Sequence, residues 1–304
     1  MKKALVLGGG FSGLACATHL GKQGFSVTLL EKNDQIGGRA RKLEKDGYTF
    51  DMGPSWYWMP DVFEGHYNHF GHTTSDFYEL VRLDPSYRVY WDDGYTDLPA
   101  DLEKLYGLFE HYEPGSSKFL KKFLKDAEYK YKVGMKEFVY KPSLSIREFM
   151  DPRLFGAALK MDLFKSIERV IRGNLKNEKL IQLLSFPVLF LGAMPSNTPA
   201  LYSLMNYADM KLGTWFPIGG MYKIIDAFIQ IADEQGVKII TGSVVESLSY
   251  RSGRIESVQA GNQKYQADLV INAMDYHHFE QRILDEPFRD YSQSYWEKRT
   301  MAPS

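Results

Sequence analysis

The sequence has little cysteine and almost no net charge. Cys16 is the one cysteine among 304 residues, which excludes an internal disulfide framework and fits a reducing cytoplasm. It is best explained as a small core residue of the first predicted helix. Lysine plus arginine (37) nearly balance aspartate plus glutamate (38), and the net charge of -1 gives no overall field that indicates nucleic acid or an acidic partner.

The sequence also lacks a long hydrophobic run. The stretch Leu183 to Pro195 is too short to cross a bilayer and contains Pro187. The N-terminal residues MKKALVLGGGFSGLACATHL begin like a signal peptide, but their glycines make a poor helical segment. We therefore expect no secretion and no membrane span. With no repeat or low-complexity linker, 304 residues and 44% hydrophobic content predict two domains.

What the sequence does contain is a β-α-β unit at its start. Lys3 to Leu7 predicts a short buried strand, and Ser12 to Gln23 predicts a helix that ends at Gly24. A second strand, Ser26 to Leu30, follows and leads into Glu31. The strand, the glycine-rich turn, the helix and the acid together are a strong signature of dinucleotide binding.

Each glycine of the turn has a separate physical purpose. Gly8 permits the tight turn from strand to helix, Gly10 lets the backbone approach a pyrophosphate, and Gly13 lets the helix pack closely on the strand. The pyrophosphate is expected at the helix N-terminus, and Glu31 is expected to accept hydrogen bonds from ribose hydroxyls. The predicted cofactor residues here are Gly8, Gly10, Phe11, Ser12, Gly13 and Glu31.

This turn alone does not separate FAD from NAD, but the next glycine pair does. Ile36-Gly37-Gly38-Arg39 brings backbone close to a bound dinucleotide, and Arg39 can meet a phosphate or a carboxylate. Taken alone, the segment could be an ordinary turn with a surface arginine. At this spacing it resembles the second glycine motif of the flavin amine oxidase and carotenoid desaturase superfamily, and so disfavours an NAD-dependent dehydrogenase.

Four further segments sharpen the resemblance: Tyr48 to Pro54, Phe216 to Met221, Gly236 to Leu248, and Ala267 to Asp275. Together they are similar to bacterial-type phytoene desaturases, from residue 2 to about residue 303. The resemblance implies FAD, with Gly38 and Arg39 in the cofactor site, Gly53 and Pro54 near the flavin ring, and the backbone of Val245 at the adenine. Members of this family continue further, so the sequence is expected to be an N-terminal portion.

The resemblance implies an α/β fold with a Rossmann-like FAD-binding domain of the GR2 type and an inserted mixed substrate domain. The expected domains are residues 1–75 with 218–285 for FAD, 76–217 for substrate, and 286–304 as the start of a further part. The implied reaction is desaturation of phytoene, an isoprenoid hydrocarbon, with hydride transfer to the flavin. Quinone or oxygen would accept the electrons. No catalytic side chain and no metal are predicted.

The resemblance also implies a cytoplasmic protein at the inner membrane surface. The stretch Lys118 to Lys141 suits either a solvated helix face or contact with anionic lipid, and the apolar stretch Leu180 to Pro217 is the other candidate for membrane contact. Trp56, Tyr57 and Trp58 suit either a packed cluster or an apolar channel. His66, His69 and His72 are spaced for one helix face, but no acidic or cysteine ligand accompanies them.

Three alternatives to phytoene desaturation stay open. The first is a related flavoenzyme, namely a C30 carotenoid desaturase, a carotenoid isomerase or an amine oxidase. The second is a non-catalytic prenyl-binding protein on the same fold, and the third is the NAD-dependent dehydrogenase.

The sequence also predicts the elements that follow the β-α-β unit. A hairpin is expected over Tyr87 to Leu98, and helices from Asp101 to Asn177 are expected to break at Pro114, Pro142 and Pro152. Further along, the sequence predicts a helix over Tyr222 to Glu234 and strands at Val237–Ile240, Val244–Tyr250, Ile255–Ala260 and Leu269–Ala273.

Overall fold

The computed structural model describes residues 1–140, 145 and 165–299. The chain divides into two compact units. Unit 1 contains Met1–Ser55, His66–Leu80 and Pro217–Ser304, and unit 2 contains Trp56–Gly65 and Val81–Phe216. The expected division had residues 286–304 as the start of a further part, whereas they belong to unit 1. It also had Trp56–Gly65 in the FAD-binding domain, whereas this segment belongs to unit 2, where Tyr57 exchanges backbone hydrogen bonds with Trp215 (3.3 and 3.0 Å).

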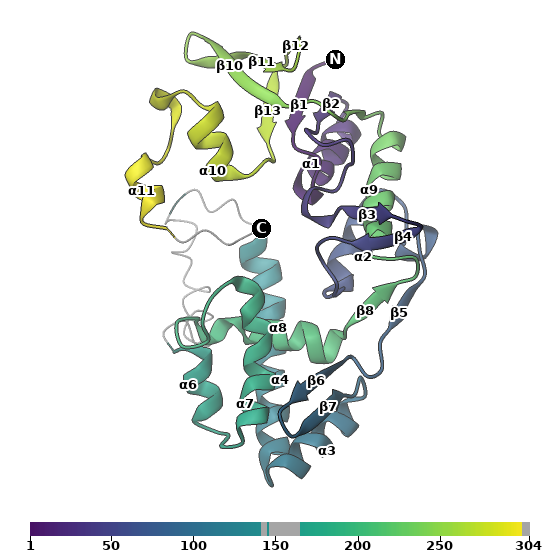
Figure 1. Ribbon diagram of the computed structural model, residues 1–304, viewed down its shortest axis with the longest axis vertical. Coiled ribbons are helices and arrows are strands. Elements are labelled where there is room, and N and C mark those ends of the chain that lie inside the picture. Colours follow the sequence, from purple (N-terminus) through teal and green to yellow (C-terminus); the bar gives the residue numbers. More distant parts are fainter. Residues whose placement is uncertain (141–144, 146–164, 300–304) are drawn as a thin grey trace. The chain divides into compact units, whose positions relative to one another are not determined.

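Unit 1 is built on a four-stranded parallel sheet of order β13-β1-β2-β9. Figure 1 labels three of these strands, β13, β1 and β2. Its strands are β1 (Lys3–Leu7), β2 (Ser26–Leu30), β9 (Lys238–Ile240) and β13 (Leu269–Asn272). In β1 every residue from Ala4 to Leu7 is buried, as expected for a parallel strand covered on both faces. Helix α1 (Phe11–Lys22) packs with α9 (Tyr222–Glu234), and their Phe11 and Phe228 rings lie 5.6 Å apart.

Two antiparallel sheets complete the strands of unit 1. The hairpin β3 (Lys42–Lys45) and β4 (Tyr48–Asp51) precedes the helix α2 (Pro60–His69). The second sheet joins β10 (Val245–Arg251), β11 (Arg254–Ala260) and β12 (Gln263–Tyr265). Its apolar face packs on the parallel sheet through Leu248 and Val258, which share one buried cluster with Leu5, Leu7 and Leu30. The short helices η2 (Thr74–Asp76), α10 (Tyr276–His278), η8 (Phe279–Ile283), η9 (Glu286–Phe288) and α11 (Gln293–Glu297) also lie in this unit.

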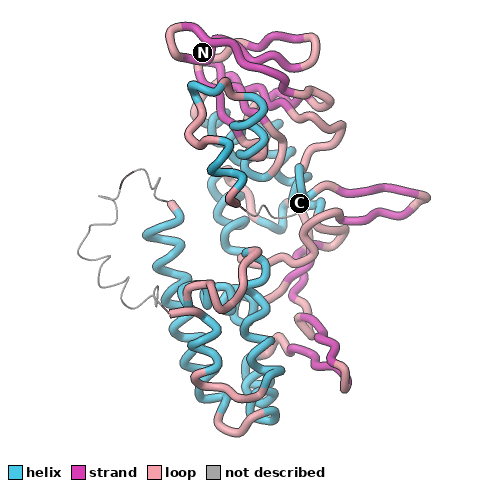
Figure 2. Tube along the Cα trace, turned by 60° about the vertical axis from the view of Figure 1, so that its left-hand side comes forward, coloured by secondary structure: helices cyan, strands magenta, loops and turns pink. Residues whose placement is uncertain are grey.

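Unit 2 is mostly helical (Figure 2). Its longer segment contains the hairpin β6 (Tyr87–Trp91) and β7 (Gly94–Leu98), followed by α3 (Leu102–Tyr112), α4 (Ser116–Val133) and the π-helical turn η3 (Gly134–Val139). After the undescribed residues come α6 (Ile167–Arg172), α7 (Glu178–Ser185), η5 (Phe186–Leu191), η6 (Ala200–Ser203), α8 (Leu204–Tyr207) and η7 (Ala208–Leu212). The core contains Leu105, Phe109, Leu120, Ile167 and Leu180, each at most 1% exposed.

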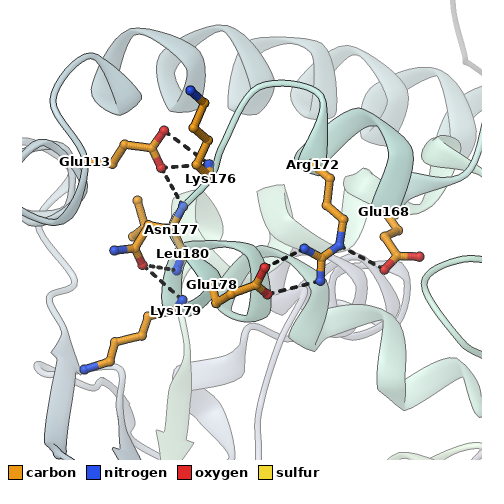
Figure 3. Close-up of polar contacts among 8 residues, drawn as sticks. All are labelled: Glu113, Glu168, Arg172, Lys176, Asn177, Glu178, Lys179 and Leu180. Carbon is orange, nitrogen blue, oxygen red and sulfur yellow. Dashed lines mark hydrogen bonds and ion pairs between the residues drawn. The ribbon is translucent and has the colours of Figure 1, made fainter.

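A polar corner fixes the start of α7 (Figure 3). The Asn177 side chain caps the helix by accepting hydrogen bonds from Lys179 N (3.0 Å) and Leu180 N (3.3 Å). Glu113, at the end of α3, accepts from Asn177 N (2.8 Å) and Lys176 N (2.9 Å). Since these bonds join segments more than 60 residues apart, the corner ties α3 to α7 within unit 2.

Most predicted elements are confirmed, several with identical bounds: Lys3–Leu7, Ser26–Leu30, Tyr48–Asp51 and Tyr222–Glu234. The break at Pro114 is confirmed between α3 and α4, whereas Pro142 and Pro152 lie outside the described residues. The sequence did not predict β3, β12 or the short pair β5 (Leu80–Arg82) and β8 (Trp215–Pro217). These strands have three or four residues, so their own alternation of polar and apolar side chains is too short to recognise.

Candidate functional site

The turn between β1 and α1 has the backbone geometry of a phosphate-binding turn. Gly8 has φ +102°, which an L side chain rarely adopts, and its N–H bonds to Leu30 O at 2.8 Å. The first hydrogen bond of α1 runs from Leu14 N to Gly10 O (2.9 Å). The N–H groups at the very start of the helix therefore have no partner within the helix, and an anion beyond the helix end can accept hydrogen bonds from them.

The glycines differ in what surrounds them. A Cβ atom on Gly13 would lie 1.8 Å from Gly8 O, so only glycine fits. A Cβ atom on Gly10 would meet nothing nearer than the Gly38 Cα at 4.0 Å, so the space above Gly10 is open. This open space beside helical N–H groups fits a pyrophosphate, which is the group that the predicted cofactor would place there.

The second glycine segment packs against this turn. Gly37 N donates to Gly9 O at 2.9 Å, and a Cβ on Gly38 would lie 3.2 Å from the Gly10 Cα. Arg39 follows in the one-turn helix η1 (Gly38–Ala40) and is exposed. Its predicted phosphate contact stays a prediction.

Glu31 lies where the sequence predicted it, at the end of β2, and it is 4% exposed. Its Oε2 accepts from Gly9 N at 2.7 Å, and its Oε1 accepts from Asn33 N (2.9 Å) and Asn33 Nδ2 (2.6 Å). The carboxylate thus holds the turn and the following loop together. A ribose hydroxyl would share these acceptor oxygens with Gly9 and Asn33, and the sequence reasoning missed Asn33.

A cavity of about 440 Å³ opens beside Glu31. It is lined by Lys32, Asn33, Asp34, Gln35, Arg41, Lys42 and Met52. Three of these side chains are cationic and one, Asp34, is anionic, so the lining has a net positive charge that is suited to the anionic part of a nucleotide. The sequence did not predict the three cationic residues, because a lysine or arginine in a loop has no local signal that distinguishes a ligand-binding side chain from a solvated one.

The remaining predicted cofactor residues surround the same region. Gly53 permits close backbone approach, since a Cβ there would lie 1.9 Å from Arg39 O. Pro54 follows it and is half-buried. Val245 begins β10 and is buried, and Ser243, two residues earlier, donates to Glu31 O at 2.8 Å. Gly53 is thus linked to the second glycine segment through Arg39, and Val245 follows a segment bonded to Glu31, while the cofactor contacts of both residues stay predictions.

Unit 2 holds a separate aromatic cluster. The Trp56 ring lies 4.7 Å from Tyr87, 5.1 Å from Phe186, 5.5 Å from Phe190 and 5.4 Å from Trp58. Phe190 is 55% exposed, and its neighbours Leu189 and Leu191 in η5 are also exposed. The cluster is therefore a packed aromatic group that reaches the surface of unit 2.

A buried carboxyl group orders this cluster. Asp209 is 1% exposed and accepts hydrogen bonds from Tyr87 OH (2.8 Å) and Thr214 Oγ1 (3.1 Å). Thr214 in turn accepts from Trp58 Nε1 at 2.8 Å. Burial raises the pKa of Asp209 to about 6. Because their polar atoms bind inward, Tyr87 and Trp58 present apolar ring surface.

Of the histidines predicted on one helix face, His66 and His69 lie on α2, whereas His72 follows the helix and its Nε2 lies 2.7 Å from Glu234 Oε2. His66 stacks on Phe228 with ring centroids 4.3 Å apart, and His69 lies 4.6 Å from the His19 ring. Burial, with His19 and His69 nearby, lowers the pKa of His66 to about 4. Within residues 1–140, 145 and 165–299, no group of three or more candidate ligands could hold a metal ion.

The lysine stretch forms the exposed face of α4. Lys118, Lys122, Lys125 and Lys132 are exposed, and Tyr129, between them, is 40% exposed. Their spacing of three, four and seven residues places them along one side of the helix. Lys141 lies outside the described residues. In the part of the chain that the structure covers, no helix has the length and apolarity needed to cross a bilayer.

Comparison with known proteins identifies similar chains. The family described as flavin containing amine oxidoreductase matches residues 11–303. The carotenoid 3,4-desaturase of Haloarcula japonica is 39% identical over 98% of this chain and 61% of its own length. The zeta-carotene-forming phytoene desaturase of Myxococcus xanthus is 31% identical over 93% of this chain and 55% of its own. A crystal structure from Pyrococcus furiosus has the same fold (TM-score 0.63, 20% identity, 99% of this chain and 66% of that chain). The chain therefore spans less than two thirds of the length of these two desaturases.

Proposed function

This chain belongs to the family of flavin containing amine oxidoreductases, FAD is its cofactor, and from that premise we propose that it is a carotenoid desaturase acting on phytoene. The observation that carries the proposal is the 39% identity to a carotenoid 3,4-desaturase, which extends over 98% of the chain. A relative at 31% identity is a phytoene desaturase. Similarity that covers both units supports a common substrate class as well as a common cofactor.

We assign the cofactor contacts to the residues around the β1–α1 turn. The N-terminus of α1, with Gly10, Phe11 and Ser12, would hold the pyrophosphate, and Glu31 with Asn33 would hold the ribose. Gly38 and Arg39 would approach the phosphates, Gly53 and Pro54 the flavin ring, and the Val245 backbone the adenine. When bound, FAD would supply a two-electron acceptor for hydride removed from one saturated carbon of the substrate, while the neighbouring carbon releases a proton and the double bond forms between them. The chain itself aligns the two reactants and excludes water.

The apolar surface of unit 2 supports a hydrocarbon substrate. In the aromatic cluster around Trp56, the polar atoms of Trp58 and Tyr87 are already bonded within the protein, so these two rings offer apolar faces. Such a surface can bury a polyene without leaving an unsatisfied hydrogen-bonding group. We propose that Trp56, Trp58 and Phe190 line the path of the substrate.

Phytoene, as a hydrocarbon of about 40 carbons, must come from a membrane. At ~0.8 kcal/mol per CH₂, its transfer from lipid to water costs on the order of 30 kcal/mol. We propose that the lysine face of α4 docks on anionic lipid, which is concentrated on the cytoplasmic leaflet. The protein would then work from the cytoplasm at the inner membrane surface, with quinone or oxygen as the electron acceptor.

The proposal is tested by pigment analysis in two bacterial hosts, one accumulating phytoene and the other a coloured carotenoid. We expect expression of the protein to convert phytoene into products that absorb at longer wavelength. The matched control is Gly10→Val, because an added Cβ there would have the Gly38 Cα, 4.0 Å away, as its nearest neighbour and would enter the pyrophosphate space. The parent should purify with a flavin spectrum and the variant without one.

The other outcomes identify the alternatives. A new product only in the host with the coloured carotenoid would favour 3,4-desaturation, as the name of the Haloarcula japonica relative suggests. A protein that binds a prenyl chain and FAD but changes neither pigment would be a binding protein. Oxidation of an amine would assign an amine oxidase. Gly10→Val with full flavin content would contradict the predicted cofactor turn.

A further inference from the structure

The strand β4 ends in an aspartate whose carboxylate reaches a helix far along the chain. Asp51 Oδ2 accepts a hydrogen bond from Met221 N at 2.7 Å, and Oδ1 accepts from Tyr222 N at 3.1 Å. These N–H groups open α9, where the side chain of the N-cap residue Met221 makes no capping bond. A carboxylate here satisfies two donors of the helix start and complements the positive end of the helix dipole.

The chain is shaped for this approach. Gly220 has φ +98°, and a Cβ atom on it would lie 3.1 Å from Asp51 Oδ2. A larger residue would therefore be strained by its backbone and would crowd the carboxylate. Asp51 is exposed, so burial alone does not explain a contact between residues 170 positions apart.

The residues after Asp51 lie backbone to backbone on the second glycine segment. Met52 N donates to Arg41 O at 2.9 Å. A Cβ on Gly53 would lie 1.9 Å from Arg39 O, which leaves no room for a side chain there. The position of the loop from Met52 to Pro54 is therefore linked to that of η1.

The second glycine segment is linked in turn to the phosphate-binding turn. Gly37 N donates to Gly9 O at 2.9 Å. Tyr222 adds a second tie from α9, because its OH donates to Ile36 O at 3.0 Å. A continuous set of contacts thus runs from the start of α9, through the Asp51 carboxylate and η1, to the start of α1.

We propose that Asp51 is a positioning residue of the FAD site: it anchors the loop Met52–Pro54 and η1 to α9, and so holds both against the phosphate-binding turn. Helix α9 is a firm reference because it packs on α1, with the Phe11 and Phe228 rings 5.6 Å apart. Asp51 acts through Met52 and η1, without contact to the cofactor. The inference rests on FAD as the cofactor, as in the proposed function.

The first test compares Asp51→Asn with Asp101→Asn in the whole chain. Asp101 is a matched control, because it caps α3 by accepting from Lys104 N at 2.9 Å and belongs to unit 2, which contains none of the predicted cofactor residues. Both variants lose a carboxylate from a helix start, so both should lower the midpoint of thermal unfolding. Only Asp51→Asn should raise the dissociation constant for FAD, by about tenfold. Asp51→Glu should recover part of that loss.

The second test does not require flavin. Amide hydrogen exchange reports directly on Gly37 and Met52, whose N–H groups carry the contacts described above. We expect Asp51→Asn to accelerate exchange at both amides by about tenfold, and Asp101→Asn to leave them unchanged. If the parent binds no FAD but the amides respond, the cofactor assignment fails and the positioning role stands. If exchange and FAD affinity in Asp51→Asn stay within about twofold of the parent, Asp51 is a helix cap only and the inference is wrong.

Discussion

Replacing Gly13 with alanine should disrupt the cofactor turn, although alanine is the best helix former. The added Cβ would lie 1.8 Å from Gly8 O and 3.0 Å from Gly8 C, both backbone atoms of the same tight turn. Normal contact would require the helix start to move by at least about 1 Å against β1, within a closely packed interior. We expect a loss of about 3 kcal/mol or more, at the upper end of overpacking costs. For a chain of this size that lowers the thermal midpoint by roughly 6–12 °C.

Gly107 in α3 provides the matched control. It also lies within a helix, but a Cβ there would meet no atom within 4 Å. Gly107→Ala should therefore stabilise the protein by about 0.5–1 kcal/mol through helix propensity. Thermal unfolding followed by circular dichroism gives the sign of both changes, and titration with FAD should detect binding in Gly107→Ala but not in Gly13→Ala. A Gly13→Ala protein as stable as the parent, with the same FAD affinity, would refute the assignment of a close helix-to-strand contact.

Three other perturbations test other parts of the molecule. Glu31→Gln should weaken FAD binding, measured by titration, by on the order of 1–2 kcal/mol, since the amide loses the charge-assisted bonds; unchanged affinity would remove Glu31 as the ribose ligand. The pKa of His66 is lowered to about 4 in the folded chain, so between pH 6.5 and 4 the unfolded chain binds more protons and stability falls on acidification. Allowing for partial solvent screening, the fall in the free energy of unfolding should amount to about 2 kcal/mol in urea unfolding, and it should be absent in His66→Phe. Equal pH profiles of the parent and His66→Phe would contradict this prediction. Co-sedimentation with anionic liposomes should weaken as salt rises, and it should weaken further in Lys122→Glu. A protein that stays in the supernatant at every salt concentration, yet desaturates liposome-borne phytoene, would exclude membrane docking.

The first β-α-β unit could be predicted closely because its signals are local. The bounds of β1 and β2 follow from apolar runs between glycines and charged residues, and the roles of Gly8 and Gly13 follow from their spacing. Helix α9 was equally clear, since its apolar residues recur with helical spacing and Gly236 follows its end. In these segments the periodicity is long enough to determine the element type.

The parts that escaped prediction depend on partners distant in sequence. Asn33 and Asp51 look like ordinary loop and strand-end residues until the fold brings Glu31 and Met221 to them. The segment Trp56–Gly65 was expected with the FAD domain, yet its contacts are in unit 2. Nothing in the sequence neighbours of Asp209 predicts that it is buried beside Tyr87. Pairings of this kind have no periodicity that one sequence could reveal.

The parallel sheet of unit 1 has a consequence for biosynthesis. Strand β2 ends at Leu30, but its neighbour β9 starts at Lys238, and β1 pairs with β13 only from Leu269 onward. At ~5–20 residues per second, a ribosome needs about 10–40 s to make the residues between β2 and β9. During that interval β1 and β2 have two unpaired edges and an uncovered apolar face, while unit 2 can already close its own core. The nascent chain therefore has a long period of exposure to aggregation, in which a chaperone that shields its N-terminal strands would raise the yield of folded protein.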